Sequence, residues 1–120
     1  MMDGETASAS NAVIEILTLT LKPDTRGNFQ QIYVNEALPL LIKWNFQVAA
    51  HRPSLHDENS YFIIRLFKNV EDRQRAEDAY YGSDDWRKGP RSVIMAMIEQ
   101  EAYTVVTVGT LKGWLEFIMK

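Results

Sequence analysis

The chain has 120 residues, a formal net charge of −3 and no cysteine, and 46% of its residues are hydrophobic. This length and apolar content predict a single domain with a core of its own. Without cysteine the chain cannot form disulfides, thiolate nucleophiles or zinc–thiolate sites. No run of Lys or Arg exceeds two residues. We therefore expect neither nucleic acid nor a membrane as a partner, because both require a concentrated basic surface.

The first 11 residues are small and polar and lack the apolar segment of a signal peptide. We expect residues 1–11 to form a disordered lead-in to a domain over residues 12–109. No apolar stretch approaches the roughly 20 residues that a membrane-spanning helix needs. A cytoplasmic location is the resulting expectation.

The first half of the chain predicts three strands and a helix. Residues 13–21 alternate with a period of two, which indicates a strand. Over residues 25–44 apolar side chains recur every three or four positions, which predicts a helix lying on a core, kinked at Pro39 because proline removes a backbone donor. Residues 46–52 and 60–67 predict two strands that a short polar loop joins as an antiparallel hairpin.

The second half predicts two helices, a last strand and a tail. Asn69 can cap a helix over residues 70–81, and Pro90 suits the first turn of another over residues 90–100. Residues 102–108 predict the fourth strand. The apolar tail, residues 110–120, fits either a helix or a strand by its spacing, and a short helix is favoured.

The order β-α-β-β-α-β predicts an α+β, ferredoxin-like fold. In that fold a four-stranded antiparallel sheet carries both helices on one face, and the first strand lies beside the third. Residues 13–21 carry Leu17 and Leu19 on one side but Ile14 and Ile16 on the other, so neither side is polar as a solvated face would be. We expect a second copy of the chain to cover the face without helices, giving a homodimer or a higher oligomer.

Four segments carry a resemblance to a known family, namely VIEILTLTLKPDTR (13–26), VNEALPLL (34–41), RPSLHDENSYFIIRLF (52–67) and AEDAYYGSDDWRKGPR (76–91). They resemble the NIPSNAP family of the dimeric α/β-barrel superfamily over about residues 13–108. The last segment is the most specific, through Tyr81, Ser83, Trp86, Gly89, Pro90 and Arg91. The resemblance implies protomers paired into a barrel, and neighbouring families with this fold include antibiotic-biosynthesis monooxygenases. Leu17 and Leu19 stand where many members carry Arg and Tyr, which makes the inner surface of this chain more apolar.

Glu15 and Arg65 are charged residues inside otherwise apolar strands. Antiparallel pairing of the first and third strands would bring them together, and we expect them to point into the barrel. A buried ion pair is costly, which favours a ligand contact flanked by Tyr61 and Tyr103, for example with a carboxylate, enol or carbonyl group. The alternative is a pair that only fixes strand register or the dimer.

The two histidines, His51 and His56, are candidates for acid–base work. His56 beside Asp57 in a polar loop equally fits a turn stabilised by hydrogen bonds. No spacing typical of a metal site is present, and no cofactor is expected. In the segment around Gly89, Trp86 and Arg91 could form a pocket rim that clamps an anionic or aromatic ligand, or could only lock the helices onto the sheet.

Two functional hypotheses follow. In the first, a homodimer binds a small, mostly apolar ligand in the barrel, with or without monooxygenase-like chemistry that needs no cofactor. In the second, the chain is a non-catalytic interaction or scaffold protein whose barrel is filled by side chains.

Overall fold

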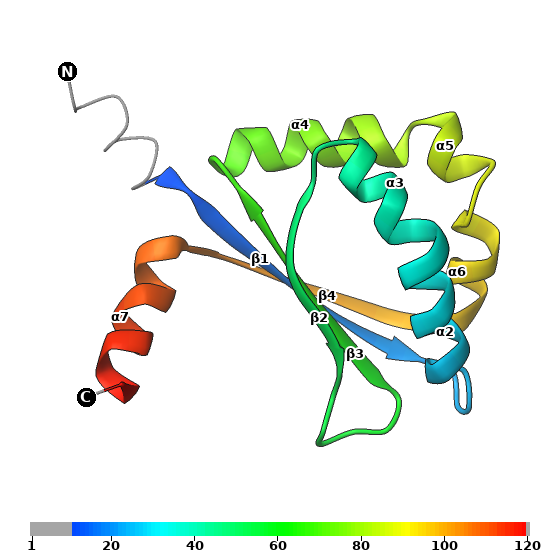
Figure 1. The fold of residues 1–120 in the computed structure, drawn as a ribbon, viewed down its shortest axis with the longest axis horizontal. Helices are drawn as coiled ribbons and strands as arrows, with labels where there is room; N and C mark the ends of the chain where they lie inside the picture. The colour runs from blue at the N-terminus through cyan, green and yellow to red at the C-terminus, as the bar shows by residue number, and fades with distance from the viewer. Residues whose placement is uncertain (1–10, 120) are drawn as a thin grey trace.

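The computed structural model describes residues 11–119 and has the predicted α+β fold. Strands β1 (Val13–Leu21), β2 (Gln47–Pro53), β3 (Ser60–Phe67) and β4 (Ile98–Thr107) form one antiparallel sheet in the order β2-β3-β1-β4 (Figure 1). The first strand therefore lies beside the third, as predicted. Most of the predicted disordered lead-in falls outside the described residues. Within them, no helix is long and apolar enough to cross a membrane.

The first helical segment contains a π-helical turn. Helix α2 (Arg26–Ile32) continues through the π-helix η1 (Tyr33–Ala37) into α3 (Leu38–Lys43). The backbone N–H of Leu38 donates to the carbonyl of Tyr33, five residues earlier. Pro39, at the start of α3, cannot donate to the preceding turn, and its ring would clash with a carbonyl of a regular α-helix. The predicted disruption at Pro39 therefore takes the form of a widened turn that keeps the helix continuous.

The second helical segment is divided into three helices. Helix α4 (Val70–Tyr81) starts where the Asn69 side chain accepts a hydrogen bond from the N–H of Asp72 at 2.6 Å. Helix α5 (Asp84–Arg87) is capped by the side chain of Ser83.

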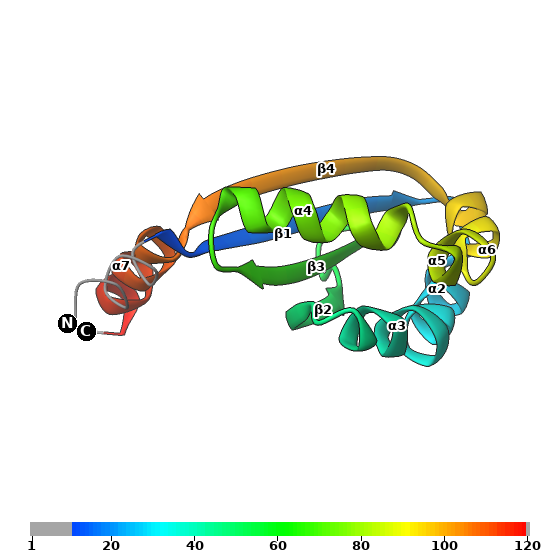
Figure 2. The same ribbon diagram turned by 90° about the horizontal axis from the view of Figure 1, so that it is seen from above.

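Helix α6 (Arg91–Met97) ends earlier than the predicted limit of residue 100. The difference arises because β4 starts at Ile98, which pairs with Leu21 at the end of β1. Pairing along the whole of β1 thus outweighs the helical pattern of residues 98–100. A last helix, α7 (Val108–Ile118), lies at the end of the sheet opposite α5 and α6 in both views (Figure 2).

The register of the sheet separates its two faces. Glu15 pairs with Arg65, so both side chains lie on one face, together with Leu17, Leu19, Tyr61, Ile63 and Phe67. All of these are buried, in a core shared with Phe29, Tyr33, Ala37, Leu41, Tyr80, Trp86 and Ile94 from the helices. The helices therefore cover the face that carries Glu15 and Arg65. The expectation that this pair points into a barrel between two sheets is wrong.

Within residues 11–119, the opposite face of the sheet carries no helix of the core. Ile16 and Ile64 pair at its centre, with Phe62 and Leu66 along β3. These four apolar side chains are partly exposed. We call this surface the open face.

Candidate functional site

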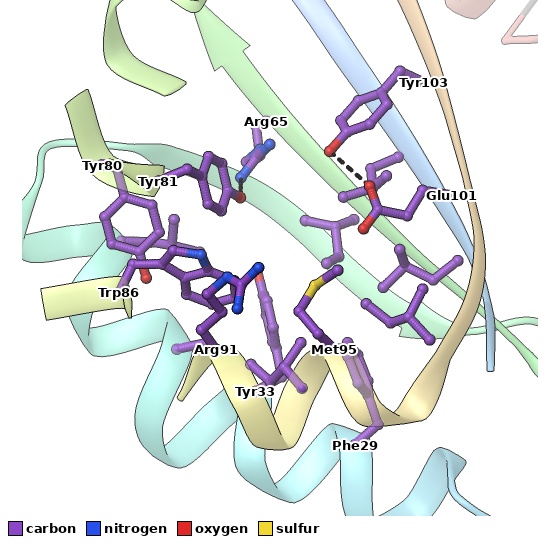
Figure 3. Close-up of a pocket in the computed structure, with 17 residues that line it drawn as sticks. Phe29, Tyr33, Arg65, Tyr80, Tyr81, Trp86, Arg91, Met95, Glu101 and Tyr103 are labelled. Carbon is purple, nitrogen blue, oxygen red and sulfur yellow. Dashed lines mark hydrogen bonds between the residues drawn. The ribbon is translucent and has the colours of Figure 1, made fainter. Parts of the chain in front are cut away.

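A cavity of about 310 Å³ lies between the sheet and the helices of the protomer. Its apolar wall includes Leu17, Leu19, Phe29, Ala37, Ile63 and Ile94. Its polar lining comes from Arg65, Arg91, Glu101 and four tyrosines, Tyr33, Tyr80, Tyr81 and Tyr103 (Figure 3). This volume lies at the lower end of the roughly 300–1,000 Å³ typical of ligand pockets. The cavity therefore suits a small, mostly apolar molecule.

Arg65 is fixed by protein groups on every side of its guanidinium. Its Nε donates to Glu15 Oε1 at 2.6 Å, Nη2 to Glu77 Oε2 at 3.0 Å and Nη1 to the Tyr81 hydroxyl at 2.8 Å. Arg73 Nε donates to the second oxygen of Glu15 at 2.7 Å. Glu15 and Arg65 have exposed side-chain fractions of 0% and 1%. Two arginines and two glutamates thus form a neutral network that holds α4 on the sheet when both acids are ionised.

The two carboxyl groups of this network differ in acidity. Burial would raise the pKa of Glu15, but the hydrogen bond from Glu77 and the nearby Arg65 and Arg73 hold that pKa below its ordinary value. Burial and the neighbouring Glu15 raise the pKa of Glu77 to about 8. The network therefore keeps Glu15 charged and favours a proton on Glu77 near neutral pH.

Two tyrosines that line the cavity have buried hydroxyls without a hydrogen-bond partner in the described part of the chain. They are Tyr33 and Tyr80. Burial raises the pKa of both phenols well above the ordinary value, so they stay protonated and can donate. An unpaired buried hydroxyl costs free energy. Both oxygens are themselves fully buried, so they weaken the packing beside the cavity and do not face its open space.

The cavity rim carries two charged side chains on opposite sides (Figure 3). On β4, Glu101 accepts a hydrogen bond from the Tyr103 hydroxyl at 3.2 Å. Arg91 begins α6 and is exposed. Within residues 11–119 the Arg91 side chain has no hydrogen bond or ion pair, so it is available to a ligand.

The structure brings together only part of the predicted site. Arg65, Tyr103, Trp86 and Arg91 line the cavity. Glu15 lies behind Arg65 and does not line it.

Tyr61 and the histidines also lie outside the lining. The Tyr61 hydroxyl forms a 2.7 Å hydrogen bond with His51 Nδ1. Burial and the nearby Arg52 lower the pKa of His51, which favours its neutral form. His56 is exposed in the β2–β3 loop, where its backbone N–H donates to Ser54 Oγ. No group of three or more potential metal ligands occurs within residues 11–119.

Six polar residues of the site were absent from the sequence-based candidates: Tyr33, Tyr80, Glu101, Arg73, Glu77 and Tyr81. The last three recur at four-residue spacing along α4, which places them on one side of the helix. That spacing, combined with two charged residues inside apolar strands, was the sequence signal for the network. Arg73 was not recognised because it lies in a charged run, which is typical of a solvated helix face.

Known proteins resemble this chain in fold but not closely in sequence. No protein-family model and no curated protein matches the sequence. A NIPSNAP-like domain protein from Burkholderia xenovorans matches the structure with a TM-score of 0.75 and 14% identity, over 81% of this chain and 84% of that chain. A NIPSNAP family protein from Agrobacterium tumefaciens gives a TM-score of 0.74 and 16% identity, over 81% and 87%.

A more distant match has a described activity. SnoaB from Streptomyces nogalater, a cofactor-independent oxygenase, has a TM-score of 0.60 and 13% identity, over 82% of this chain and 93% of that chain. Identities this low establish the fold alone. The chain therefore has the ferredoxin-like α+β fold of the NIPSNAP proteins, which its sequence resemblance predicted.

Proposed function

We propose that this chain is a NIPSNAP-like protein that forms a homodimer and binds a small, mostly apolar ligand in each protomer. The ligand lies in the cavity between sheet and helices, and not in a space between two sheets. The observation that carries the proposal is the cavity of about 310 Å³ itself, whose largely apolar wall also carries a few polar side chains, among them Arg91 and Tyr103. An apolar cavity with a few convergent polar groups is typical of small-molecule sites.

The homodimer is supported by the open face. Ile16, Phe62, Ile64 and Leu66 form a contiguous apolar surface at the centre of the sheet. A second copy related by a two-fold axis would bury both surfaces at once. A monomer would leave them in contact with water, which soluble proteins generally avoid over areas of this kind.

A second candidate function is oxygenation of the bound ligand without a cofactor. Its support is the fold shared with a cofactor-independent oxygenase, together with hydrogen-bond donors in the cavity. The guanidinium of Arg91 would stabilise an enolate or phenolate of the ligand. Glu101 is the carboxylate among the lining residues that could take up a proton. The scaffold hypothesis, in contrast, needs no ligand.

Binding can be tested by calorimetric titration with 1-naphthamide, a neutral bicyclic probe small enough for the cavity. Ala37→Leu places a larger side chain in the cavity wall and should weaken binding by about tenfold or more. Ala79→Leu makes the same change at an exposed position of α4 and should bind as the parent does.

Ligand identity requires protein from its own host. Native mass spectrometry under gentle conditions would report the dimer mass and any retained small molecule together. A monomeric mass would contradict the assembly. Oxygen consumption by the purified protein with the identified ligand would then separate oxygenation from binding alone. Absence of both a ligand and probe binding would favour the scaffold.

A further inference from the structure

We infer that the ligand is a carboxylate with a compact apolar body, whose charged group is bound by Arg91 at the mouth of the cavity. This inference rests on the proposed function, because it concerns the same cavity. It goes further by assigning the ligand a charge and an orientation.

The first observation is the state of the charged groups that line the cavity. Every guanidinium nitrogen of Arg65 already has a protein partner, with Glu15 and Glu77 within 3.0 Å and the Tyr81 hydroxyl at 2.8 Å. Glu101 accepts the Tyr103 hydrogen bond. Arg91, by contrast, has no ionic partner within the described part of the chain. An anionic ligand group is therefore the complement that Arg91 lacks.

The second observation is a basic hollow directly outside. It has a volume of about 500 Å³ and is lined by Tyr81, Asp84, Arg87, Lys88 and Arg91. Among the described residues that line it, Asp84 is the only one with a carboxylate, and it forms a salt bridge of 3.3 Å with Lys88. Tyr81 and Arg91 line both this hollow and the apolar cavity. A molecule that fills the cavity and extends outwards therefore enters a positively charged region at Arg91. This positive charge favours a negative group on the part of the ligand that lies there.

The third observation fixes the orientation. Arg91 and Tyr33 both point toward the middle of the cavity, while Glu101 lies on the far side, on β4 (Figure 3). A carboxylate beside Glu101 would be repelled, whereas beside Arg91 it can accept two parallel N–H bonds. The apolar body then contacts Leu17, Leu19 and Ile94.

Two probes of nearly the same shape test this inference, 1-naphthoate and the neutral 1-naphthamide. Calorimetric titration should show 1-naphthoate binding about tenfold more tightly, because a hydrogen-bonded charge pair is stronger than its neutral counterpart. In Arg91→Gln the two probes should bind equally, and Arg91→Lys should retain part of the preference. Arg75→Gln removes the same charge from an exposed position of α4 and should keep the full preference.

The outcomes separate the two proposals. Equal affinity of the parent protein for both probes would overturn the inference and leave the proposed function standing. A preference that survives in Arg91→Gln would also overturn it, because another group would then bind the carboxylate. If neither probe binds, the proposed function fails and the inference fails with it. Arg91 is exposed, so an unchanged melting temperature will show that its variants remain folded.

Discussion

Arg65 and Glu15 lie 50 positions apart in the sequence, yet they are direct partners across β1 and β3, with Nε donating to Oε1 at 2.6 Å. Shifting the register by one residue would place one of these charges on the open face, away from its partner. The contact therefore specifies which strand residues pair. It also means that neither charge is free to bind a ligand directly.

Removing one member of this pair should be strongly destabilising. Glu15→Gln leaves Arg65 and Arg73 without their shared carboxylate in a buried position, and we expect a loss of about 3–5 kcal/mol in the free energy of unfolding. Urea denaturation measures it. The double variant Glu15→Leu/Arg65→Leu should lose less, because Arg73 and Glu77 still pair with each other. A loss below about 1 kcal/mol for Glu15→Gln would contradict a buried network.

Stability should fall as pH rises through the range set by Glu77. Its pKa is about 8 in the folded protein against an ordinary 4.5, so between these values the folded state binds more protons than the unfolded state. The free energy of unfolding then decreases with pH across that window. Glu15 has a lowered pKa, and its contribution is lost only at lower pH.

Glu77→Gln replaces the carboxyl group with an amide that cannot ionise. The free energy of unfolding of this variant should therefore depend less on pH. Urea midpoints at about pH 5, 6, 7 and 8 measure the effect. Glu71→Gln, at an exposed position of the same helix, is the matched control and should keep the parent slope. His51, whose lowered pKa adds stability as the pH rises, contributes to both proteins alike. Equal slopes for the parent and Glu77→Gln would show that Glu77 is not protonated in the fold.

Removing the hydroxyl of either of two tyrosines that line the cavity should change the stability of the protein in opposite directions. Tyr33→Phe removes an unpartnered hydroxyl and should raise the stability of the ligand-free protein by about 1 kcal/mol. Tyr81→Phe removes the acceptor of Arg65 Nη1 and should lower it by about 1–3 kcal/mol. Thermal denaturation of both variants checks the pair. A destabilised Tyr33→Phe would mean that its hydroxyl already has a partner.

A charge at the centre of the open face should dissociate the proposed dimer. Ile64→Lys places an ammonium group opposite Ile16, where it can still reach water in a monomer but not in a packed interface. Light scattering after gel filtration should report half the mass of the parent protein. Asn28→Lys, exposed on α2, adds the same charge away from the sheet and should leave the mass unchanged. A parent that is itself monomeric would exclude the dimer.

The turn that positions Arg91 should not tolerate a side chain at Gly89. A Cβ atom there would lie 2.2 Å from the carbonyl oxygen of Asp85. Gly89→Ala should therefore destabilise the protein and weaken probe binding, because α5 and α6 must move apart. Gly27→Ala meets nothing within 4 Å and should stabilise helix α2 by about 0.5–1 kcal/mol. Equal melting temperatures for both variants would contradict this role of Gly89.

The order of the strands was predictable from the sequence, but the orientation of the sheet was not. Alternation in residues 13–21 specified two faces, and the charged residues at 15 and 65 had to pair. Both faces are apolar, however, so alternation does not encode which one the helices cover. For this reason the charged pair was assigned to the wrong side.

The cavity itself depends on distant packing. In the sequence, Tyr33 is one of several large side chains that recur at helical spacing over residues 25–44. Nothing in the sequence shows that its hydroxyl lacks a hydrogen-bond partner among the described residues. Arg91, in contrast, stood out because Gly89 and Pro90 precede it and fix the start of α6.

Because of the π turn in η1, the continuous helix α2–η1–α3 must keep its number of residues for its core side chains to face the sheet. Phe29, Tyr33, Ala37 and Leu41 all face the sheet at steps of four residues, although in a regular α-helix such positions would drift by about 40° per step. The widened turn absorbs that drift with one additional residue. Deleting a residue between Tyr33 and Ala37 would rotate everything before it by about 100° and turn Phe29 away from the cavity. Substitutions in this segment change what the cavity accepts, whereas insertions and deletions would change whether it exists.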